Sequence, residues 1–389
     1  MKSISKSQEI IFLTLVSLFW FAQYVYMPHQ TTYLTAYGIA GNMIGVIIGA
    51  YGVSQLLFRL PLGLMADKVG KHKLFILIGA LSSGIASLIR VISPGEIGFL
   101  IGNLISGFAS AMWISFMVFY SNYYSEDEQH TANSRIILYN NLGILLGFVS
   151  SSLLYDKIGM RNTCVLSLIA GFLAFGLGCF IKESKSVHTT ITVGELLQVC
   201  FHKQILVFAM IALIQQGIQL STTMSFTTQI LKNLGASGAV IGAASIVYMV
   251  SSVSFAGIAN CNFCKKRGAK FFIPFVLLVV AFYCILIPSV NSIPLIFMLQ
   301  ILPGMSTGIL FSYAVSEAMK GVPKEKKSTA MGFFQAFYAL GMTFIPVLTG
   351  NVATAFNIKT AYFVLAGIAI AGCVLALCYY KKWIRKLAS

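Results

Sequence analysis

Residues 63–73 read Gly-Leu-Met-Ala-Asp-Lys-Val-Gly-Lys-His-Lys. Apolar runs at 42–65 and 73–92 flank this stretch, and each is long enough for one helix to cross a bilayer. The glycines, Asp67 and the lysines of the stretch predict a short, positively charged loop at a membrane surface. The stretch therefore predicts two membrane-spanning helices that are joined on one side of a bilayer.

The rest of the chain continues this apolar pattern. Of its 389 residues, 57% are hydrophobic and 10% are charged, whereas a soluble protein needs far more charge to cover its surface. Each apolar span has the length that a tilted helix needs to cross a bilayer. The sequence predicts an all-α membrane protein whose twelve transmembrane helices form two pseudo-symmetric six-helix bundles, with spans at 9–27, 42–65, 73–92, 97–121, 136–154, 162–181, 204–226, 238–259, 271–289, 293–318, 328–349 and 361–380.

The net charge of +16 is explained by where the basic residues fall. With the N-terminus inside, 21 of them lie in predicted inner loops and five, including Arg90, in outer loops, while Arg59 lies near the inner end of its span. This excess follows the positive-inside rule and predicts a bacterial multi-pass protein of the cytoplasmic (inner) membrane with both termini in the cytoplasm. The predicted partners are therefore membrane lipids and not nucleic acid, and the basic tail at 381–386 would bind lipid headgroups.

The second half of the chain repeats the first. Asn103-x-x-x-Gly107 recurs as Gln300-x-x-x-Gly304 at an offset of 197 residues. Such repeats in transporters flank a central site near the middle of the bilayer. Closely spaced glycines of the second span also predict tight helix packing; they are Gly41, Gly45, Gly49 and Gly52. The predicted units are an N-terminal six-helix bundle, a cytoplasmic linker and a C-terminal six-helix bundle, at 1–182, 183–203 and 204–389.

The loop at 63–73 resembles the signature between the second and third helices of the major facilitator superfamily of secondary transporters. The resemblance covers nearly the whole chain and implies alternating access, in which the two bundles rock about a central site. It also implies that Asp67 contacts the start of the helix at 328–329 and latches the bundles together on the cytoplasmic side, in the outward-facing state. The alternative is a solvated loop that only sets topology. The predicted conformational latch consists of Gly63, Asp67, Lys68, Gly70 and Lys71.

Proton coupling usually needs a titratable group at membrane depth. None of the eleven acidic residues falls in the middle of a predicted span, so the coupling candidates are Glu317 and His29, each of which could instead be structural. Two patterns of proton-coupled exporters are missing. Asn103 stands where their fourth helix has an arginine, and their fifth-helix Gly-Pro pair has no counterpart here. Protons are therefore only a candidate partner.

Neutral polar side chains are spread through the predicted spans. An amide that faces lipid leaves its donors unsatisfied, so these side chains should point into the protein. They suit a neutral or amphipathic organic substrate, and no arginine or lysine is expected deep enough to bind a strongly anionic one. Hydrogen bonding between helices is the alternative role. The candidate substrate-binding residues are Gln23, Tyr24, Gln55, Asn103, Asn140, Gln215, Gln219, Tyr248, Gln300, Gln335 and Tyr338.

The sequence thus predicts a secondary active transporter that exports a small neutral or amphipathic organic molecule. Uptake of a neutral nutrient such as a sugar or nucleoside, by facilitation or symport, is one alternative, and lipid flipping is another. An enzyme is not expected, because neither HExxH nor a serine nucleophile motif with a partner histidine occurs. No catalytic residue, cofactor or metal is predicted, since Cys261-x-x-Cys264 lacks a second pair of ligands. A monomer is the family expectation.

Overall fold

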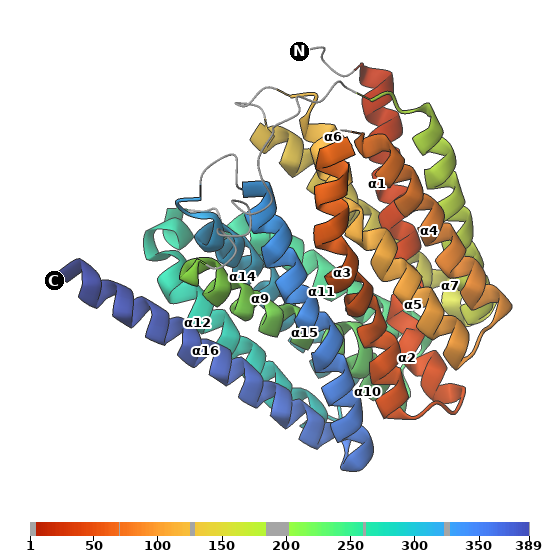
Figure 1. Cartoon of the computed structure of the whole chain (residues 1–389). Coiled ribbons are helices and arrows are strands. Elements are labelled where there is room, and N and C mark those ends of the chain that lie inside the picture. The colour runs from red at the N-terminus through yellow and green to blue at the C-terminus, as the bar shows by residue number, and fades with distance from the viewer. Residues whose placement is uncertain are drawn as a thin grey trace.

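The computed structural model describes residues 5–69, 71–124, 129–183, 202–259, 262–322 and 327–388 (Figure 1). Within these ranges the side chains of 63, 64, 66–69, 129–131, 133, 134, 262, 265, 327–329 and 382–388 are not described. The described residues fold into helices and contain no β-strand. The prediction of an all-α protein is confirmed.

Successive spans cross the molecule in alternating directions, so the molecule has two ends (Figure 1). We call one of them the basic end; it holds residues 5–9, 71–73, 180–183 and 319–322. The opposite end, which we call the far end, holds residues 37–40, 93–95, 234–237, 290–292 and 356–357.

The first half of the chain makes six spans. Its helices are α1 (Lys6–Tyr24), α2 (Met27–Ala36), α3 (Gly41–Val69), α4 (His72–Ile92), α5 (Glu96–Ala111), α6 (Trp113–Ser121) and α7 (Gln129–Phe180). The pair α1 and α2 forms one span, as does the pair α5 and α6. The 52-residue α7 covers two spans, because its backbone breaks at Gly159, where φ is 72°. Glycine adopts this left-handed conformation without a steric penalty, so the break marks the turn between spans five and six.

The second half makes the other six spans. Its elements are α9 (Lys203–Ser221), η2 (Thr222–Phe226), α10 (Thr227–Asn233), α11 (Gly238–Ile258), α12 (Asn262–Leu286), η3 (Ile287–Ser289), α13 (Ile293–Leu299), α14 (Ile301–Met319), α15 (Lys327–Ala355) and α16 (Ile358–Ala388). The described residues contain 11 helical segments that are long and apolar enough to cross a membrane, and α7 counts twice. The prediction of twelve helices is confirmed.

The two halves correspond at a constant offset. α9 begins 197 residues after α1, and α13 begins 197 residues after α5. η3, which completes the ninth span, ends 197 residues after the end of α4. The internal repeat in the sequence is therefore also a repeat in the structure.

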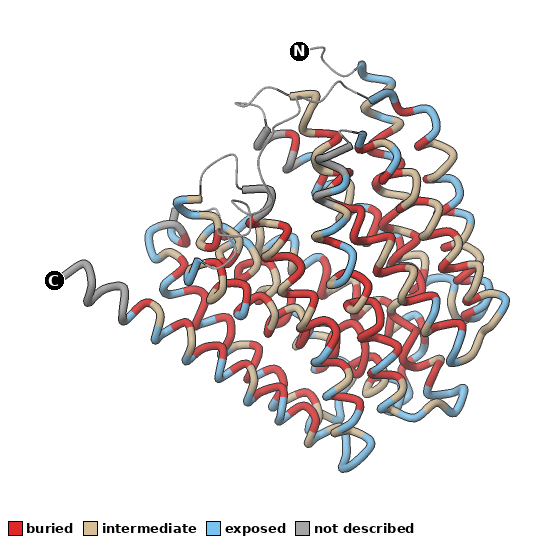
Figure 2. Tube along the Cα trace, in the orientation of Figure 1, coloured by how far each residue is buried: buried red, intermediate tan, exposed pale blue. Residues whose placement is uncertain are grey.

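Many large apolar side chains are exposed on the outside of the bundle. Buried and exposed positions alternate along the helices (Figure 2). Examples on the outside are Leu153, Phe282, Phe344 and Leu377, each more than half exposed. A surface that is apolar over this extent belongs in lipid, where every backbone polar group must be satisfied within the helices.

The halves pack tightly where α3 crosses α15. A Cβ atom on Gly45 would lie 2.4 Å from the Pro346 carbonyl oxygen, and one on Gly49 would lie 2.4 Å from that of Thr343. Only residues without a side chain allow two helix backbones to approach this closely. The predicted role of these glycines in close packing is confirmed.

Candidate functional site

Hydrogen bonds between the two halves gather at the far end. The hydroxyl oxygens of Thr31 and Ser225 lie 2.7 Å apart and share a hydrogen bond. The backbone N–H of Asn42 donates to the hydroxyl of Thr354 at 2.8 Å. Each contact joins one half to the other close to the far end of its helices, so the far end is closed in this structure.

Asp156 makes the most directional of these contacts. Its two carboxylate oxygens accept the backbone N–H groups of Gly238 and Ala239 at the start of α11, both at 3.0 Å. The hydroxyl of Ser152, one turn earlier on α7, donates to the carbonyl of Ala239 at 2.6 Å. A helix N-terminus stabilises a carboxylate through its unpaired N–H groups and its dipole. We call Ser152, Asp156, Gly238 and Ala239 the far-end latch.

Five tyrosines converge between the halves at membrane depth. The phenol of Tyr24 lies close enough to those of the other four to interact with them electrostatically. We call this group the tyrosine cluster; it consists of Tyr24, Tyr26, Tyr51, Tyr248 and Tyr338. The sequence predicts Tyr24, Tyr248 and Tyr338 as site residues but not the other two, because a lone phenol in an apolar span is equally typical of core packing.

Candidate amides of the second half divide between this region and a separate network. The Gln215 amide donates to the Thr307 hydroxyl at 2.8 Å and to the Gln219 amide oxygen at 3.3 Å, and Tyr248 also contacts Thr307, at 3.2 Å. These side chains therefore adjoin the tyrosine cluster. Gln300 instead interacts with Tyr283 on α12. Its role fits hydrogen bonding between helices.

Several predicted amides are buried with unpaired atoms. Gln23 is 2% exposed and neither its oxygen nor its nitrogen has a partner. One amide oxygen each on Asn140 and Gln335 is also buried without a partner, and Gln55 is buried. A buried polar group without a partner costs about 1–3 kcal/mol. A polar ligand or a water molecule that pairs with these groups would remove that cost.

A cavity of about 10 Å³ adjoins the tyrosine cluster. That volume is the size of a site for a single water molecule. Both halves contribute to its wall, which consists of Tyr26, Met27, Gln30, Ile48, Tyr51, Asn103, Leu220 and Met224. The amide oxygen of Gln30 is buried without a partner. The cavity therefore combines a polar group that needs a partner with thioether, aliphatic and phenol surfaces.

Arg90 corrects the expectation that no cation reaches membrane depth. The side chain is 1% exposed and its guanidinium stacks on the Tyr26 ring, with Cζ 4.1 Å from the ring centroid. Nη2 donates to the side-chain oxygens of Asn103 at 2.9 Å and Ser106 at 2.8 Å. An arginine near the end of a span predicts a surface charge, but here its long side chain turns back into the bundle.

Arg59 is a second buried cation. It is 3% exposed on α3, and its Nη1 donates to the hydroxyl of Tyr338 on α15 at 2.6 Å. This hydrogen bond joins the two halves on the basic-end side of the tyrosine cluster. The cluster thus has a guanidinium on each side.

The two coupling candidates lie at opposite ends of the molecule. His29 is buried near the far end and stacks on Tyr155, with ring centroids 3.7 Å apart. Glu317 lies near the basic end of α14, within electrostatic reach of Tyr379 and Tyr380. Neither residue belongs to the tyrosine cluster. A role for either in proton coupling stays a prediction.

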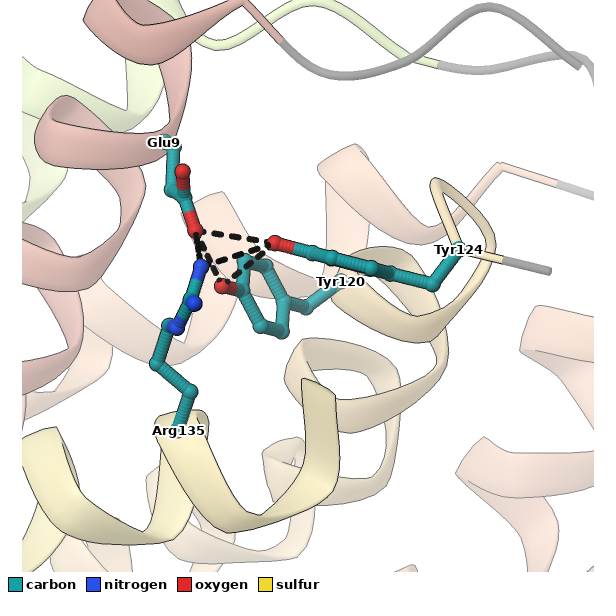
Figure 3. A network of polar contacts seen from close by, with 4 residues as sticks. All are labelled: Glu9, Tyr120, Tyr124 and Arg135. Atoms are coloured by element: carbon teal, nitrogen blue, oxygen red, sulfur yellow. Dashed lines mark hydrogen bonds and ion pairs between the residues drawn. The ribbon is translucent and has the colours of Figure 1, made fainter. Parts of the chain in front are cut away.

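A polar network fastens the basic end of the first half (Figure 3). The carboxylate of Glu9 on α1 accepts hydrogen bonds from the hydroxyls of Tyr120 at 2.7 Å and Tyr124 at 2.8 Å. Arg135 on α7 forms an ion pair with the same oxygen at 2.5 Å. Burial raises the pKa of Tyr124. The phenol therefore stays protonated and can donate a hydrogen bond to Glu9. The network ties three spans of one half together.

The predicted latch lies mostly outside the described side chains. α3 continues to Val69, so Gly63, Asp67 and Lys68 fall in its last turns and not in the loop that the sequence predicts. Their side chains and all of Gly70 lie outside the described residues. Lys71 is described and exposed, directly before α4. The latch function of this segment stays a prediction.

The part of the chain that the structure describes contains no group of three or more histidine, cysteine or acidic side chains arranged to hold a metal ion. Cys264 is buried, and Cys261 lies outside the described residues.

The family model for the Major Facilitator Superfamily matches residues 12–230 and 205–386, which together span nearly the whole chain. This chain belongs to the Major Facilitator Superfamily. It is a multi-pass membrane transporter and not an enzyme. The inner membrane transport protein YajR of Escherichia coli (strain K12) is 25% identical over 177 residues, which are 45% of this chain and 38% of YajR. The match thus spans well under half the length of that relative.

Two solved transporter structures share the fold of this superfamily member. The nucleoside transporter NupG has a TM-score of 0.74 at 15% identity, with 94% of this chain and 99% of that chain covered. A bacterial homologue of the human lysosomal transporter Spinster, in an inward-facing and unoccupied conformation, has a TM-score of 0.73 at 13% identity, with 97% of each chain covered. At these identities the likeness concerns the fold alone.

Proposed function

We propose that this transporter exports a small amphipathic organic molecule across the cytoplasmic membrane by alternating access. The observation that carries the proposal is the tyrosine cluster, which gathers phenols from both halves at membrane depth beside buried, unpaired amides. Phenol rings offer apolar faces and amides offer hydrogen bonds, which is the usual combination in pockets for small organic ligands.

The proposed motion is a rocking of residues 1–182 against residues 204–389, with 183–203 as the linker. The excess of basic residues in the loops at the basic end supports a cytoplasmic location for that end. With that orientation, closure of the far end by the far-end latch makes this an inward-facing state. The fold likeness to the Spinster homologue, solved in an inward-facing conformation, supports this assignment.

Uptake of a neutral nutrient is the second candidate, and the fold likeness to the nucleoside transporter NupG favours it. Direction separates the two candidates. Inside-out vesicles from cells that express the chain should accumulate amphipathic dyes when energised, whereas right-side-out vesicles should not. Vesicles from cells without the chain are the control. Saturable accumulation of a nucleoside or sugar in right-side-out vesicles alone would instead establish uptake.

A further inference from the structure

The interior of the transporter carries two positive charges at membrane depth. The guanidinium of Arg90 bonds Asn103 and Ser106, which lie seven and ten residues into α5 from Glu96. At 1.5 Å per residue, it sits about 10–15 Å from the far end. Tyr338, which accepts from Arg59, lies eight residues inside the basic-end limit of its span at Ala330, or about 12 Å.

Neither guanidinium is neutralised by a described acid. Nε and Nη1 of Arg90 and Nε of Arg59 are buried without a hydrogen-bond partner. Every described acid lies near one end of the molecule; these acids are Glu9, Glu96, Asp156, Glu183 and Glu317. A charge that is held in a membrane interior without a counter-charge is costly, and such residues usually serve a ligand or an ion.

The internal repeat argues against a role in packing alone. At the offset of 197 residues, Arg90 corresponds to Ile287 and Arg59 corresponds to Ala256. Ile287 is 0% exposed, so an aliphatic side chain fills the equivalent space in the second half. Packing of this architecture therefore does not require a cation at either position.

The surroundings of the two cations are apolar and aromatic. Arg90 stacks on Tyr26 and bonds Asn103, and both of these residues line the cavity that Met224 also lines from the second half. Tyr26 lies at the junction between α1 and α2. A ligand at this place would meet a cation at one point and rings, thioethers and aliphatic chains elsewhere.

We propose that the transported solute is an amphipathic organic anion whose carboxylate is bound by Arg90. The proposal rests on the proposed function and names its substrate class. Nη1 of Arg90 is a buried guanidinium donor without a partner, and a carboxylate is the acceptor that pairs with a guanidinium by a charge-assisted hydrogen bond. The rings of the tyrosine cluster would take the apolar body of the solute.

The test uses acids with their neutral amides as matched probes. Thermal unfolding of the purified transporter in detergent is followed with benzoate, phenylacetate and indole-3-acetate, each beside its amide, and with sodium chloride at equal concentration. At least one acid should raise the unfolding temperature while its amide and chloride do not. Equal effects of acid and amide would overturn the proposal. An equal effect of chloride would show that the cations hold an inorganic anion and would also overturn it.

Variants then assign the effect to Arg90. Arg90→Gln should weaken binding of the active acid by about tenfold or more, because a hydrogen-bonded charge is lost. Arg59→Gln, on the other side of the tyrosine cluster, should weaken it less. The control Arg161→Gln removes an exposed positive charge near the far end and should change nothing. Arg90→Ile introduces the residue that stands at the equivalent position of the second half, Ile287. This variant should fold, and without ligand its unfolding temperature should not be lower than that of the unmodified protein. Unchanged acid binding in Arg90→Gln would overturn the assignment, as would collapse of Arg90→Ile.

Failure of the proposed function has a different signature. In proteoliposomes, transport of amides or cationic dyes but not of acids would leave export standing and remove only the anion proposal. Transport of none of these compounds, together with acid binding in the unfolding assay, would remove the export proposal and leave the anion site standing.

Discussion

Removal of the Asp156 carboxylate should open the far end of the transporter. In Asp156→Ala, the N–H groups of Gly238 and Ala239 at the start of α11 lose an acceptor at 3.0 Å each. Loss of a capping side chain costs about 0.5–2 kcal/mol. If most of this free energy belongs to the far-end-closed state, the equilibrium shifts toward opening by about 2- to 30-fold. Asp156→Asn keeps one acceptor and loses the charge, which is worth about 0.3–1 kcal/mol at a helix terminus.

Hydrogen–deuterium exchange in nanodiscs measures this opening. Peptides that cover 41–52 of α3 and 343–354 of α15 do not touch Asp156, yet they form the same closed end. Their backbone amides should exchange several-fold faster in Asp156→Ala, and less so in Asp156→Asn. Glu96→Ala is the matched control, because it removes an exposed far-end acid from the first turn of α5. Faster exchange confined to 238–245 would show a purely local cap and would refute the latch.

Three further substitutions test other parts of the structure. Glu9→Gln should lower the free energy of unfolding by about 1–2 kcal/mol, since it removes the ion pair with Arg135 and weakens the hydrogen bond from Tyr120. Chemical denaturation measures this loss, and Tyr120→Phe, the comparison variant, should lower the free energy of unfolding by less. Gln23→Leu should leave thermal stability unchanged or raise it, because the Gln23 amide has no partner. Transport by this variant in proteoliposomes should fall, and retained transport would remove Gln23 from the site. Asp67→Asn should slow transport at normal expression if the predicted latch operates, and an unchanged rate would argue for a solvated loop.

The sequence predicts the architecture well because the lipid environment imposes simple rules. Span length, apolar composition and the distribution of basic residues depend on bilayer thickness and charge, so they can be counted along the chain. The offset of 197 residues between Asn103 and Gln300 likewise returns as the offset between whole helices. These properties are local or periodic, and no knowledge of packing is needed to see them.

The site is harder to predict because side-chain direction decides it. Arg90 lies near the end of a span, where a basic residue usually faces headgroups, yet its side chain turns inward onto Tyr26. Asp156 has no sequence pattern around it, and its partners lie 82 and 83 residues away along the chain. The candidate amides also separate only in three dimensions, since Gln215 adjoins the tyrosine cluster whereas Gln300 meets Tyr283.

The central claim is that the two halves rock about the tyrosine cluster. Distances between spin labels at both ends of the molecule test it most directly, in a background without native cysteines. Exposed label sites are Ile92 and Phe356 at the far end, and Phe180 and Phe263 at the basic end. The account predicts that Asp156→Ala populates a longer far-end distance together with a shorter basic-end distance. A longer far-end distance with an unchanged or longer basic-end distance would contradict alternating access in this chain.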